Sequence, residues 1–397
     1  MLDYALLDRT AKAVGDSYYI FWPEKLLQQY QRFQTAFSQY EGNLKIAYAL
    51  KANYSPFICR ELHRCGAFAE VCNRIELSIA MMTGFRMDHI IINGPGITLQ
   101  DFCDTENWNQ CLIHVDSIEA LNEILSFSQA NPNVTIRVGL RLFLRTRRGC
   151  FSRFGIELSD EFICFLESIL KQHPNIRLEG IHCHIKRRKP LDWREKVHEM
   201  IAAYVRLQTA GIECLSYIDF GGGFPLDDWE EMQIIVDDII STIKNQCQRT
   251  PVPAIIVEPG AELVANCMSF ASRVKRTKQL ADKHYAIIRA SRFHVEASTK
   301  NRTIECQVYP YNNEQRAQSE YCIAGSTCME DDVIAVANKV VKTGDYLLFE
   351  NVGAYVSTLI PQFGFEQFAV VSYENERCKL VRKPESTSQA IMHIDKQ

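Results

Sequence analysis

The segment LEGIHCHIKRRKPLDWREKVHEMIAAYVRLQTAGIECLSYIDFGGGFP (residues 178–225) contains a strand, a helix and a second strand, and this unit decides the fold. LEGIHCHI (178–185) is an apolar run of strand length. Residues 193–210 have the apolar spacing of an amphipathic helix, and YIDF (217–220) is a second short strand. A helix between two strands is the usual crossover between neighbouring parallel strands. The segment therefore predicts a parallel sheet covered by helices.

The same alternation extends over most of the chain. Other strands are predicted at residues 44–50, 68–72, 89–93, 112–115, 135–142 and 254–258. Other helices are predicted at residues 24–37, 56–65, 117–129, 160–171 and 229–248. About eight such units over about 240 residues fit a closed (β/α)₈ barrel better than an open sheet.

The two ends of the chain follow a different pattern. SYYIFW (17–22) is a predicted strand, and after about Met268 short strands alternate with turns while long helices are rare. This pattern predicts a β-rich domain beside the barrel. The last segment, KPESTSQAIMHIDKQ (383–397), is polar and is predicted to be a loose tail.

Composition excludes several classes of partner and location. A formal net charge of -4 in 397 residues argues against nucleic acid or an anionic membrane as a partner. The chain has neither an apolar run of the ~20 residues that a membrane span needs nor the apolar stretch of a signal peptide at its N-terminus. Its 15 cysteines form no C-x-x-C pair, which predicts reduced thiols and a cytoplasmic protein. His182 and His184 share one face of a predicted strand with no third ligand apparent, so no metal site is predicted.

Polar groups follow several strands of the predicted barrel, at the end where barrel enzymes carry their active sites. Lys51 follows one apolar run, His184 another, the glycines 221–223 a third and Glu258 a fourth. Each group alone is also typical of ordinary structure: a surface lysine, a core histidine, a flexible turn or a surface carboxylate. Their common position is what indicates a site.

Together these groups have the chemistry that pyridoxal 5′-phosphate needs. A partly buried lysine loses proton affinity and becomes a nucleophilic amine that can form a Schiff base. Glycines expose backbone N–H groups to a phosphate. An imidazole can lie flat on the cofactor ring, and a carboxylate can keep a pyridine nitrogen protonated. The sequence therefore predicts pyridoxal phosphate as the cofactor.

The order of the motifs resembles that of the fold-type III pyridoxal-phosphate decarboxylases, which include diaminopimelate, ornithine and arginine decarboxylases. The motifs are YALKAN (48–53), the His-Cys-His-Ile strand, GPG (94–96), SRFGI (152–156), DFGGGFP (219–225), VEPG (257–260), Cys328-x-x-x-Asp332 and GAY (353–355). The resemblance implies a barrel of the alanine racemase type over residues 25–265. It also implies a β-barrel or β-sandwich domain formed by residues 1–24 and 266–397. A head-to-tail homodimer is expected, with each active site completed by the partner's cysteine loop.

The resemblance also implies roles for individual residues. Lys51 is similar to the Schiff-base lysine, His184 to the ring-stacking imidazole and Glu258 to the partner of the pyridine nitrogen. Cys328 resembles the thiol that crosses the dimer interface and returns a proton after carbon dioxide leaves. The remaining expected cofactor contacts are the acidic residue Glu70, the phosphate-loop residues Gly221, Gly222 and Gly223, then Gly260 and Tyr355.

Three departures from the family pattern affect the expected site. The usual Gly-Ser after His-Ile is replaced by Lys186 and Arg187, and the usual arginine after EPG is Ala261. Losing a serine and an arginine near a dianion removes charge-assisted hydrogen bonds. One hypothesis is that Arg187 or Arg188 supplies the missing charge. The alternatives are a solvated loop or a basic loop that receives an anionic substrate.

The third departure concerns the substrate. Met329 stands where the family has an acidic residue that reads a distal amine, although Glu330 or Asp331 can compensate by a small shift in register. Other expected substrate contacts are Asp332, Arg289, Arg292 and His294. In these features the chain resembles divergent decarboxylases of siderophore and other secondary-metabolite assembly, whose substrates carry extra carboxylates.

The sequence thus predicts a pyridoxal-phosphate-dependent decarboxylase acting on an amino acid or an amino-acid conjugate. Two alternatives remain open. One is an amino-acid racemase, because racemases share the barrel and the lysine. The other is a non-catalytic regulator built on the decarboxylase scaffold, which the missing arginine and serine favour.

Overall fold

The structure, a computed structural model, describes residues 2–144, 152–185, 188–226, 228–247, 252–296, 306–359 and 364–391. Its contacts divide the chain into two compact units. One comprises residues 28–263, and the other comprises residues 1–27 together with 264–397. Lys186 and Arg187, on which part of the charge hypothesis rests, lie outside the described residues.

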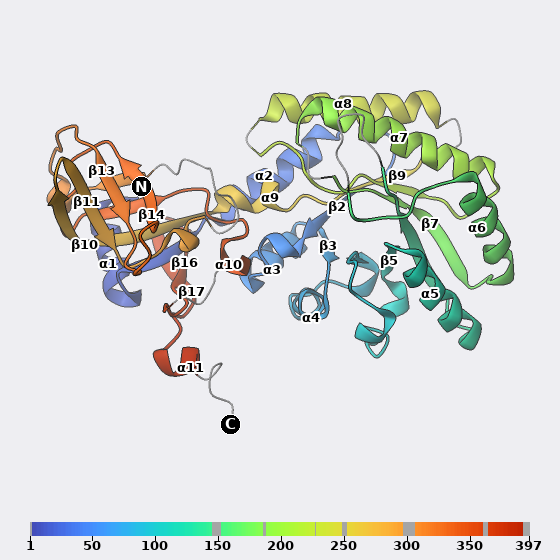
Figure 1. The fold of residues 1–397 in the computed structure, drawn as a ribbon, viewed down its shortest axis with the longest axis horizontal. Helices are drawn as coiled ribbons and strands as arrows, with labels where there is room; N and C mark the ends of the chain where they lie inside the picture. The colour runs from blue at the N-terminus through green and yellow to red at the C-terminus, as the bar shows by residue number, and fades with distance from the viewer. Residues whose placement is uncertain are drawn as a thin grey trace. The chain divides into compact units, whose positions relative to one another are not determined.

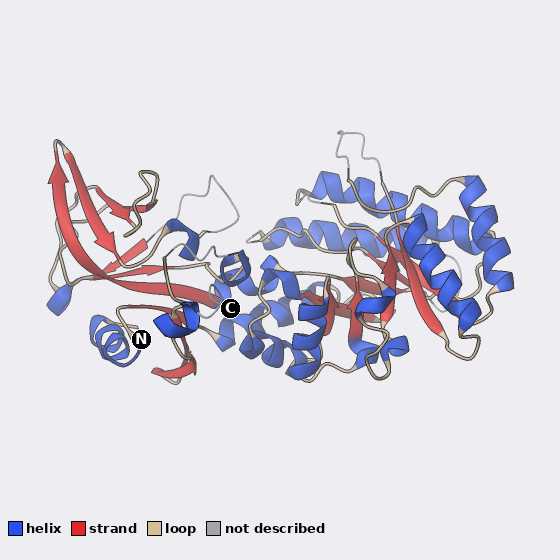
Figure 2. Cartoon of the chain, turned by 60° about the horizontal axis from the view of Figure 1, so that its bottom comes forward, coloured by secondary structure: helices blue, strands red, loops and turns tan. Residues whose placement is uncertain are grey.

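The first unit contains a closed barrel of eight strands, as predicted. In order around the barrel they are β2 (Leu44–Ala49), β3 (Phe68–Val71), β4 (Ile90–Ile92), β5 (Leu112–Val115), β6 (Ile136–Arg141), β7 (Ile176–His182), β8 (Tyr217–Asp219) and β9 (Ala254–Val257). Each strand is parallel to its neighbours, and β9 closes the ring by pairing with β2. Figure 2 shows the strands surrounded by helices. The predicted (β/α)₈ architecture is therefore confirmed.

Burial on both faces explains why these strands are short apolar runs. All three isoleucines of β4 are buried, because one face of the strand packs inside the barrel and the other packs under the helices. A core cluster inside the barrel combines small and large side chains, namely Ala47, Ile91, Leu112, Tyr217 and Ile256. This filling makes the barrel a packed core and confines chemistry to its ends.

Helices connect the strands, and several of them begin at a capping side chain. They are α2 (Pro23–Ala36), α3 (Pro56–Arg64), α4 (Arg74–Met82), α5 (Ile118–Ala130), α6 (Asp160–Gln172), α7 (Pro190–Thr209) and α8 (Trp229–Gln246), followed by the short α9 (Ala261–Val264). Ser117, Ser159 and Asp228 each accept a backbone N–H in the first turn of the following helix. Helices α7 and α8 lie side by side on the barrel (Figure 1). Helix α4 was not predicted.

The second unit is built on a mixed sheet. Its strands are β1 (Ser17–Phe21), β10 (Met268–Leu280), β11 (Lys283–Ile288), β12 (Cys306–Tyr309), β13 (Tyr321–Ala324), β14 (Val333–Ala337), β15 (Tyr346–Phe349), β16 (Ala369–Glu374) and β17 (Arg377–Arg382). The N-terminal strand β1 lies between β10, which is antiparallel to it, and β16, which is parallel. All five residues of β1 are buried, so residues far apart in sequence form one core.

Three helices complete the second unit, α1 (Tyr4–Val14), α10 (Val356–Leu359) and α11 (Thr387–Ile391). The expectation of a loose C-terminal tail is wrong for α11, which lies within it. Helix α1 was not predicted, although Asp3 caps its N-terminus and its apolar face packs on the sheet.

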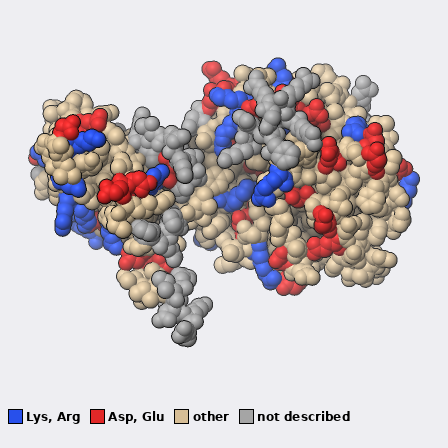
Figure 3. Space-filling model, viewed as in Figure 1, with Lys and Arg blue, Asp and Glu red and all other residues tan. Residues whose placement is uncertain are grey.

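Charges of both signs occur on the face of the molecule drawn in Figure 3, where basic and acidic side chains are interspersed. No helix among the described residues is long and apolar enough to cross a membrane.

Candidate active site

The polar groups that follow the barrel strands lie at one end of the barrel. Lys51 is in a 3₁₀ turn (Leu50–Ala52) directly after β2, Glu258 follows β9, and the glycines 221–223 follow β8. Glu70 is in β3, and His184 comes just after β7. All are at the C-terminal ends of parallel strands, where barrel enzymes carry their active sites.

Lys51 forms an ion pair with a buried carboxylate. Its Nζ lies 2.5 Å from Oε2 of Glu70 and 3.5 Å from Sγ of Cys72, while the Cys72 thiol donates to Oε1 of Glu70 at 3.1 Å. The Glu70 side chain is fully buried, whereas that of Lys51 is 38% exposed at the barrel mouth. The amine is thus accessible on one side and held by a carboxylate on the other.

This pairing reverses the expected change in proton affinity. Burial is the largest single effect and lowers the pKa of Lys51, but the negative charges of Glu70, Cys72 and Glu258 and the hydrogen bond to Glu70 together outweigh it, and the net pKa is raised. Burial also raises the pKa of Glu70, an effect that the Lys51 charge opposes. The expectation that Lys51 loses proton affinity is therefore wrong, because a carboxylate 19 residues away in sequence is its closest partner.

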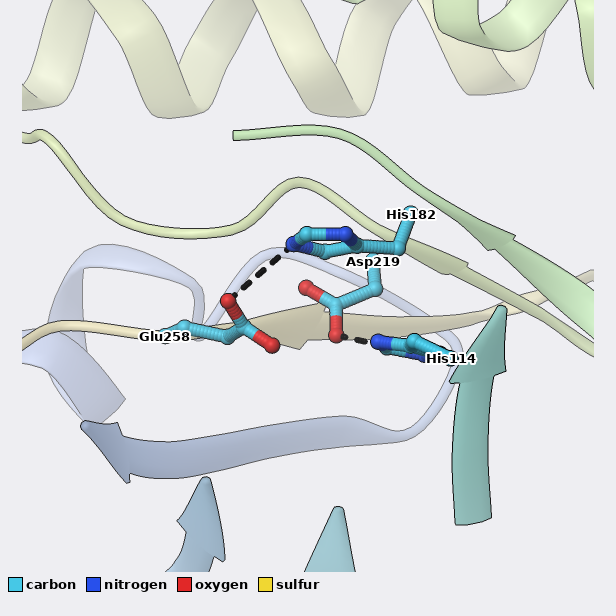
Figure 4. Close-up of side chains that lie close together, drawn as sticks. All are labelled: His114, His182, Asp219 and Glu258. Carbon is cyan, nitrogen blue, oxygen red and sulfur yellow. Dashed lines mark hydrogen bonds and ion pairs between the residues drawn. The ribbon is translucent and has the colours of Figure 1, made fainter. Parts of the chain in front are cut away.

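Glu258 is the centre of a buried hydrogen-bond network. Its two oxygens accept bonds from Nδ2 of Asn93 at 3.1 and 3.3 Å, and Oε2 lies 3.1 Å from Nε2 of His182 (Figure 4). Burial, and next the charge of Arg141, hold the pKa of His182 well below its ordinary value, so the ring is neutral. Since a carboxylate only accepts hydrogen bonds, the single ring proton of His182 is on Nε2. Donors therefore reach both oxygens of Glu258.

A second carboxyl group lies beside this network. Burial, and next the charge of Glu258, raise the pKa of Asp219 well above its ordinary value. Two neighbouring carboxylates in a water-excluded site do not both ionise readily. The Asp219 carboxyl therefore favours its protonated form, and its Oδ2 is 3.9 Å from Nε2 of His114.

The donor atoms of His114, His182, Asp219 and Glu258 lie within 4.8 Å of one another (Figure 4). The expectation that no further potential ligand lies near His182 is thus wrong, because β5, β8 and β9 bring three of them together across the barrel. Part of their hydrogen-bonding capacity is satisfied within the protein, whereas Nδ1 of His114, Nδ1 of His182 and Oδ2 of Asp219 have no hydrogen-bond partner among the described residues. His182 bonds to Glu258, and Nε2 of His114 is 3.1 Å from the Tyr217 hydroxyl. The rings of His114 and His182 stack at 4.7 Å.

The glycine loop (residues 221–223) is held by its own neighbours. The N–H of Gly221 donates to Oδ1 of Asp219 at 2.8 Å, and the N–H of Gly222 donates to Nδ1 of His184 at 3.1 Å. The expectation that the glycines expose their N–H groups is therefore wrong for two of the three. No bond between described residues takes the N–H of Gly223. Because Nδ1 of His184 accepts, the neutral ring carries its proton on Nε2.

These residues fit a phosphorylated aldehyde cofactor. A Cβ on Gly222 would lie 2.4 Å from the backbone oxygen of Glu258, and one on Gly221 would lie 2.8 Å from that of Cys183. The absence of side chains lets the loop approach the ends of β9 and β7. A Cβ on Gly260 would likewise lie 3.1 Å from Cβ of Ala52, in the turn after β2, and the Gly260 N–H donates to Glu262 at 2.9 Å.

We expect the substitution Gly222→Ala to lower the free energy of unfolding by about 1–3 kcal/mol, because backbone rather than a flexible side chain occupies the added methyl position. Chemical denaturation of purified protein measures this change. Gly96→Ala is the matched control, since a Cβ there meets nothing within 4 Å. Equal stability of the two variants would show that the loop can shift away from β9.

The remaining predicted residues belong to the second unit. Cys328 and Glu330 are exposed, Met329 is half-buried, and Tyr355 is half-buried with a φ of 61°. Asp332 is 4% exposed and accepts bonds from the Arg292 N–H at 2.8 Å and from the Thr327 hydroxyl at 2.5 Å. These bonds hold the Asp332 carboxylate within its own unit.

The predicted basic residues of this unit also have partners. Nη2 of Arg289 lies 2.9 Å from a carboxylate oxygen of Glu366, and Arg292 lies 3.4 Å from that of Asp331. His294 is buried, and its Nδ1 accepts the N–H of Ser291 at 3.0 Å. These contacts stabilise the β-rich unit.

Arg188 lies where the chain lacks the expected arginine. Its Nη1 donates at 2.6 Å both to the backbone oxygen of Phe224 and to Oε1 of Glu262, the residue after Ala261. The guanidinium thus bridges the end of the glycine loop and the start of α9. This geometry favours Arg188 as a substitute for the arginine that the family has at position 261.

Sequence reasoning missed Asn93, Cys72, His114 and Asp219. The first two could have been found, because each is the last residue of a predicted apolar run, like Lys51. His114 and Asp219 are inside strands, where the sequence does not distinguish a buried polar pair from ordinary alternation.

Comparison with known proteins agrees with this geometry. Residues 24–265 match the model of the pyridoxal-binding domain of pyridoxal-dependent decarboxylases. The chain is 25% identical over 407 residues to the diaminopimelate decarboxylase of Aquifex aeolicus, covering 96% of this chain and 92% of the relative. It is 26% identical over 370 residues to that of Methanocaldococcus jannaschii, covering 87% and 83%.

Solved structures share the fold. The diaminopimelate decarboxylase of M. jannaschii in complex with L-lysine has a TM-score of 0.87 at 22% identity, covering 98% of this chain and 94% of that one. The arginine decarboxylase of Paramecium bursaria Chlorella virus has a TM-score of 0.77 at 20% identity, covering 93% and 100%. Since the family model spans more than half of the chain, the protein belongs to the pyridoxal-dependent decarboxylases, and its cofactor is pyridoxal phosphate.

Proposed function

We propose that this protein decarboxylates an amino acid or amino-acid conjugate that carries an extra carboxylate, with Lys51 binding the cofactor. The observation that carries the proposal is the position of the Lys51 amine at the barrel mouth, 2.5 Å from a buried glutamate. Glu258 and His184 follow other strands at the same end of the barrel. Pyridoxal phosphate, when bound, supplies a ring that accepts the electrons released as a bond to the α-carbon breaks.

The residues have distinct tasks in this proposal. Lys51 must lose a proton before its amine can attack a carbonyl. Glu70 is in direct contact with that amine, and burial raises its pKa, so it is suited to accept the proton. Glu258 would hold a proton on the pyridine nitrogen of the bound cofactor. His184, fixed by the Gly222 N–H, lies against the ring.

The substrate proposal rests on Met329 and on the relatives. An acidic residue would bind a distal ammonium group of the substrate by an ion pair, and a methionine cannot form this ion pair. The relatives reported above are named diaminopimelate decarboxylases, and diaminopimelate has a carboxylate at each end. A substrate with an extra carboxylate, of the kind used in siderophore or other secondary-metabolite assembly, fits both observations.

Release of carbon dioxide from a panel of candidate substrates tests the proposal. The panel should contain diaminopimelate, lysine, ornithine, arginine and citryl conjugates of diamines and amino acids. We expect turnover of a member with an extra carboxylate and none of arginine or ornithine. Inversion at the α-carbon without carbon dioxide release would indicate a racemase. Turnover restricted to simple diamino acids would contradict the substrate proposal.

We also propose that Cys328 acts in the site of a second subunit. Lys51→Ala and Cys328→Ala should each lose activity, and mixing them after subunit exchange should restore about a quarter of the wild-type rate. In a mixed head-to-tail dimer, both substitutions fall in one site and leave the other intact. Native mass spectrometry verifies the exchange. Mixed dimers without activity would show that Lys51 and Cys328 serve the same subunit's site.

A further inference from the structure

The phosphate end of the proposed site has fewer donors than the glycine loop suggests. The N–H groups of Gly221 and Gly222 are bonded to Asp219 and His184. Position 261 is alanine, and the Arg188 guanidinium is paired with Glu262 at 2.6 Å. As far as the described residues go, positive charge beyond that of the paired Arg188 would favour a phosphate dianion at this loop.

A buried lysine lies directly behind the loop. Lys196, on α7, is completely buried, and its Nζ donates to the backbone oxygen of Phe220 at 2.7 Å. The same Nζ is 3.1 Å from the centre of the Trp193 ring, whose Nε1 donates to the backbone oxygen of Gly223 at 2.9 Å. One turn of α7 thus holds the residues at both ends of the glycine loop.

The charge of Lys196 is not neutralised by a direct ion pair. Among the described residues, no carboxylate oxygen lies within 4.0 Å of its Nζ. A buried ammonium without a direct ion pair is unfavourable, and burial lowers the pKa of Lys196 to about 7, although the more distant groups Cys183, Asp219, Glu258 and Glu262 oppose this shift. The cation–π contact with Trp193 recovers part of this loss. An anion bound on the other side of the loop would complete the charge balance.

The charge of Lys196 also affects a residue of the proposed site. After burial and the charge of Lys51, the charge of Lys196 is the next cause that lowers the pKa of His184. Lys196 therefore acts over the distance between α7 and the glycine loop, although its ammonium is behind the backbone.

We propose that Lys196 is a positioning residue that makes the glycine loop selective for a phosphate dianion. It acts through the Phe220 carbonyl and through its charge, and it supplements Arg188, whose guanidinium is already paired with Glu262. This inference rests on the proposed function, because it concerns the phosphate end of the same cofactor site.

Binding of pyridoxal phosphate and of pyridoxal, which lacks the phosphate, separates this role from a structural one. In absorbance titrations of the apoprotein, Lys196→Met should weaken binding of pyridoxal phosphate about tenfold or more. Binding of pyridoxal should stay within a factor of about two. Inorganic phosphate should also compete less well against pyridoxal phosphate in the variant. An unchanged ratio of the two affinities would overturn the proposal.

Two further variants complete the design. Lys196→Gln keeps a hydrogen-bond donor for the Phe220 backbone oxygen but removes the charge. It can therefore be used in the same titrations if Lys196→Met does not fold. Selectivity like that of the wild type in Lys196→Gln would show that only the hydrogen bond matters and would refute the charge role.

Lys45→Met is the matched control, since Lys45 also lies over an aromatic ring, 5.3 Å from Phe68, but at the other end of β2. If the wild type binds neither compound, the proposed function fails; if only the ratio is insensitive to Lys196, this inference alone fails.

Discussion

Lys51→Ala should yield a protein with no covalent cofactor adduct and no decarboxylase activity. The amine is the group that can join an aldehyde, and no other described lysine side chain contacts Glu70. Wild-type protein treated with pyridoxal phosphate and borohydride should gain one cofactor mass on the peptide containing Lys51. The variant should gain none there, as measured by peptide mass spectrometry.

The control for this experiment must account for the buried carboxylate left behind. Without Lys51, Glu70 has lost the charge that opposes the rise in its pKa, so it becomes protonated and remains buried. The fold should therefore persist, which thermal unfolding can verify. Lys45→Ala removes another lysine of β2, away from the mouth, and should keep the full adduct. An adduct of wild-type yield in Lys51→Ala would remove the basis of the proposed site.

The fold could be predicted because its signal is local. An apolar run such as residues 90–92 is buried on both faces, and the helix that follows each strand has its own spacing and cap. Helices α1 and α4 were missed although Asp3 and Asn73 cap their first turns. The first half of β10 is buried, whereas its charged second half is exposed. The 13-residue strand therefore lacks the continuous apolar run that predicts a buried strand. Helix α4 is short and was hidden between two strands.

The sequence predicts which residues belong to the site, but it does not predict which of them contact one another. The rule that a polar group follows each strand finds Lys51, His184 and Glu258, because the end of the strand is visible in the sequence. Their partners depend on which strands are neighbours in the closed barrel. The Lys51–Glu70 pair joins β2 to β3, and the His182–Glu258 bond joins strands that are not adjacent in the barrel. Proton affinities follow from these contacts, which explains why the direction predicted for Lys51 was wrong.

Glu258→Gln should lower kcat by about 10²–10³-fold, the size of effect seen when one preorganised charge-stabilising group is removed from an active site. Glutamine keeps the volume of Glu258, which is 3% exposed, but it cannot hold a proton on the pyridine nitrogen by charge. Its amide also meets the donors of Asn93 and His182, which were bonded to a carboxylate. KM should change much less than kcat, since the substitution acts on the reacting ring rather than on substrate binding.

Asp219 will not replace the lost charge in this variant. Its pKa is raised first by burial and only second by the charge of Glu258, so it stays protonated when Glu258 is removed. Glu179→Gln is the control, because Glu179 is a buried carboxylate of the same barrel that pairs with Arg137 at 2.7 Å. Its kcat per folded molecule should equal that of the wild type. Steady-state rates of carbon dioxide release test both predicted kcat values. They should be measured on cofactor-saturated protein. A kcat within a factor of about three of the wild type would show that Glu258 does not act on the ring nitrogen.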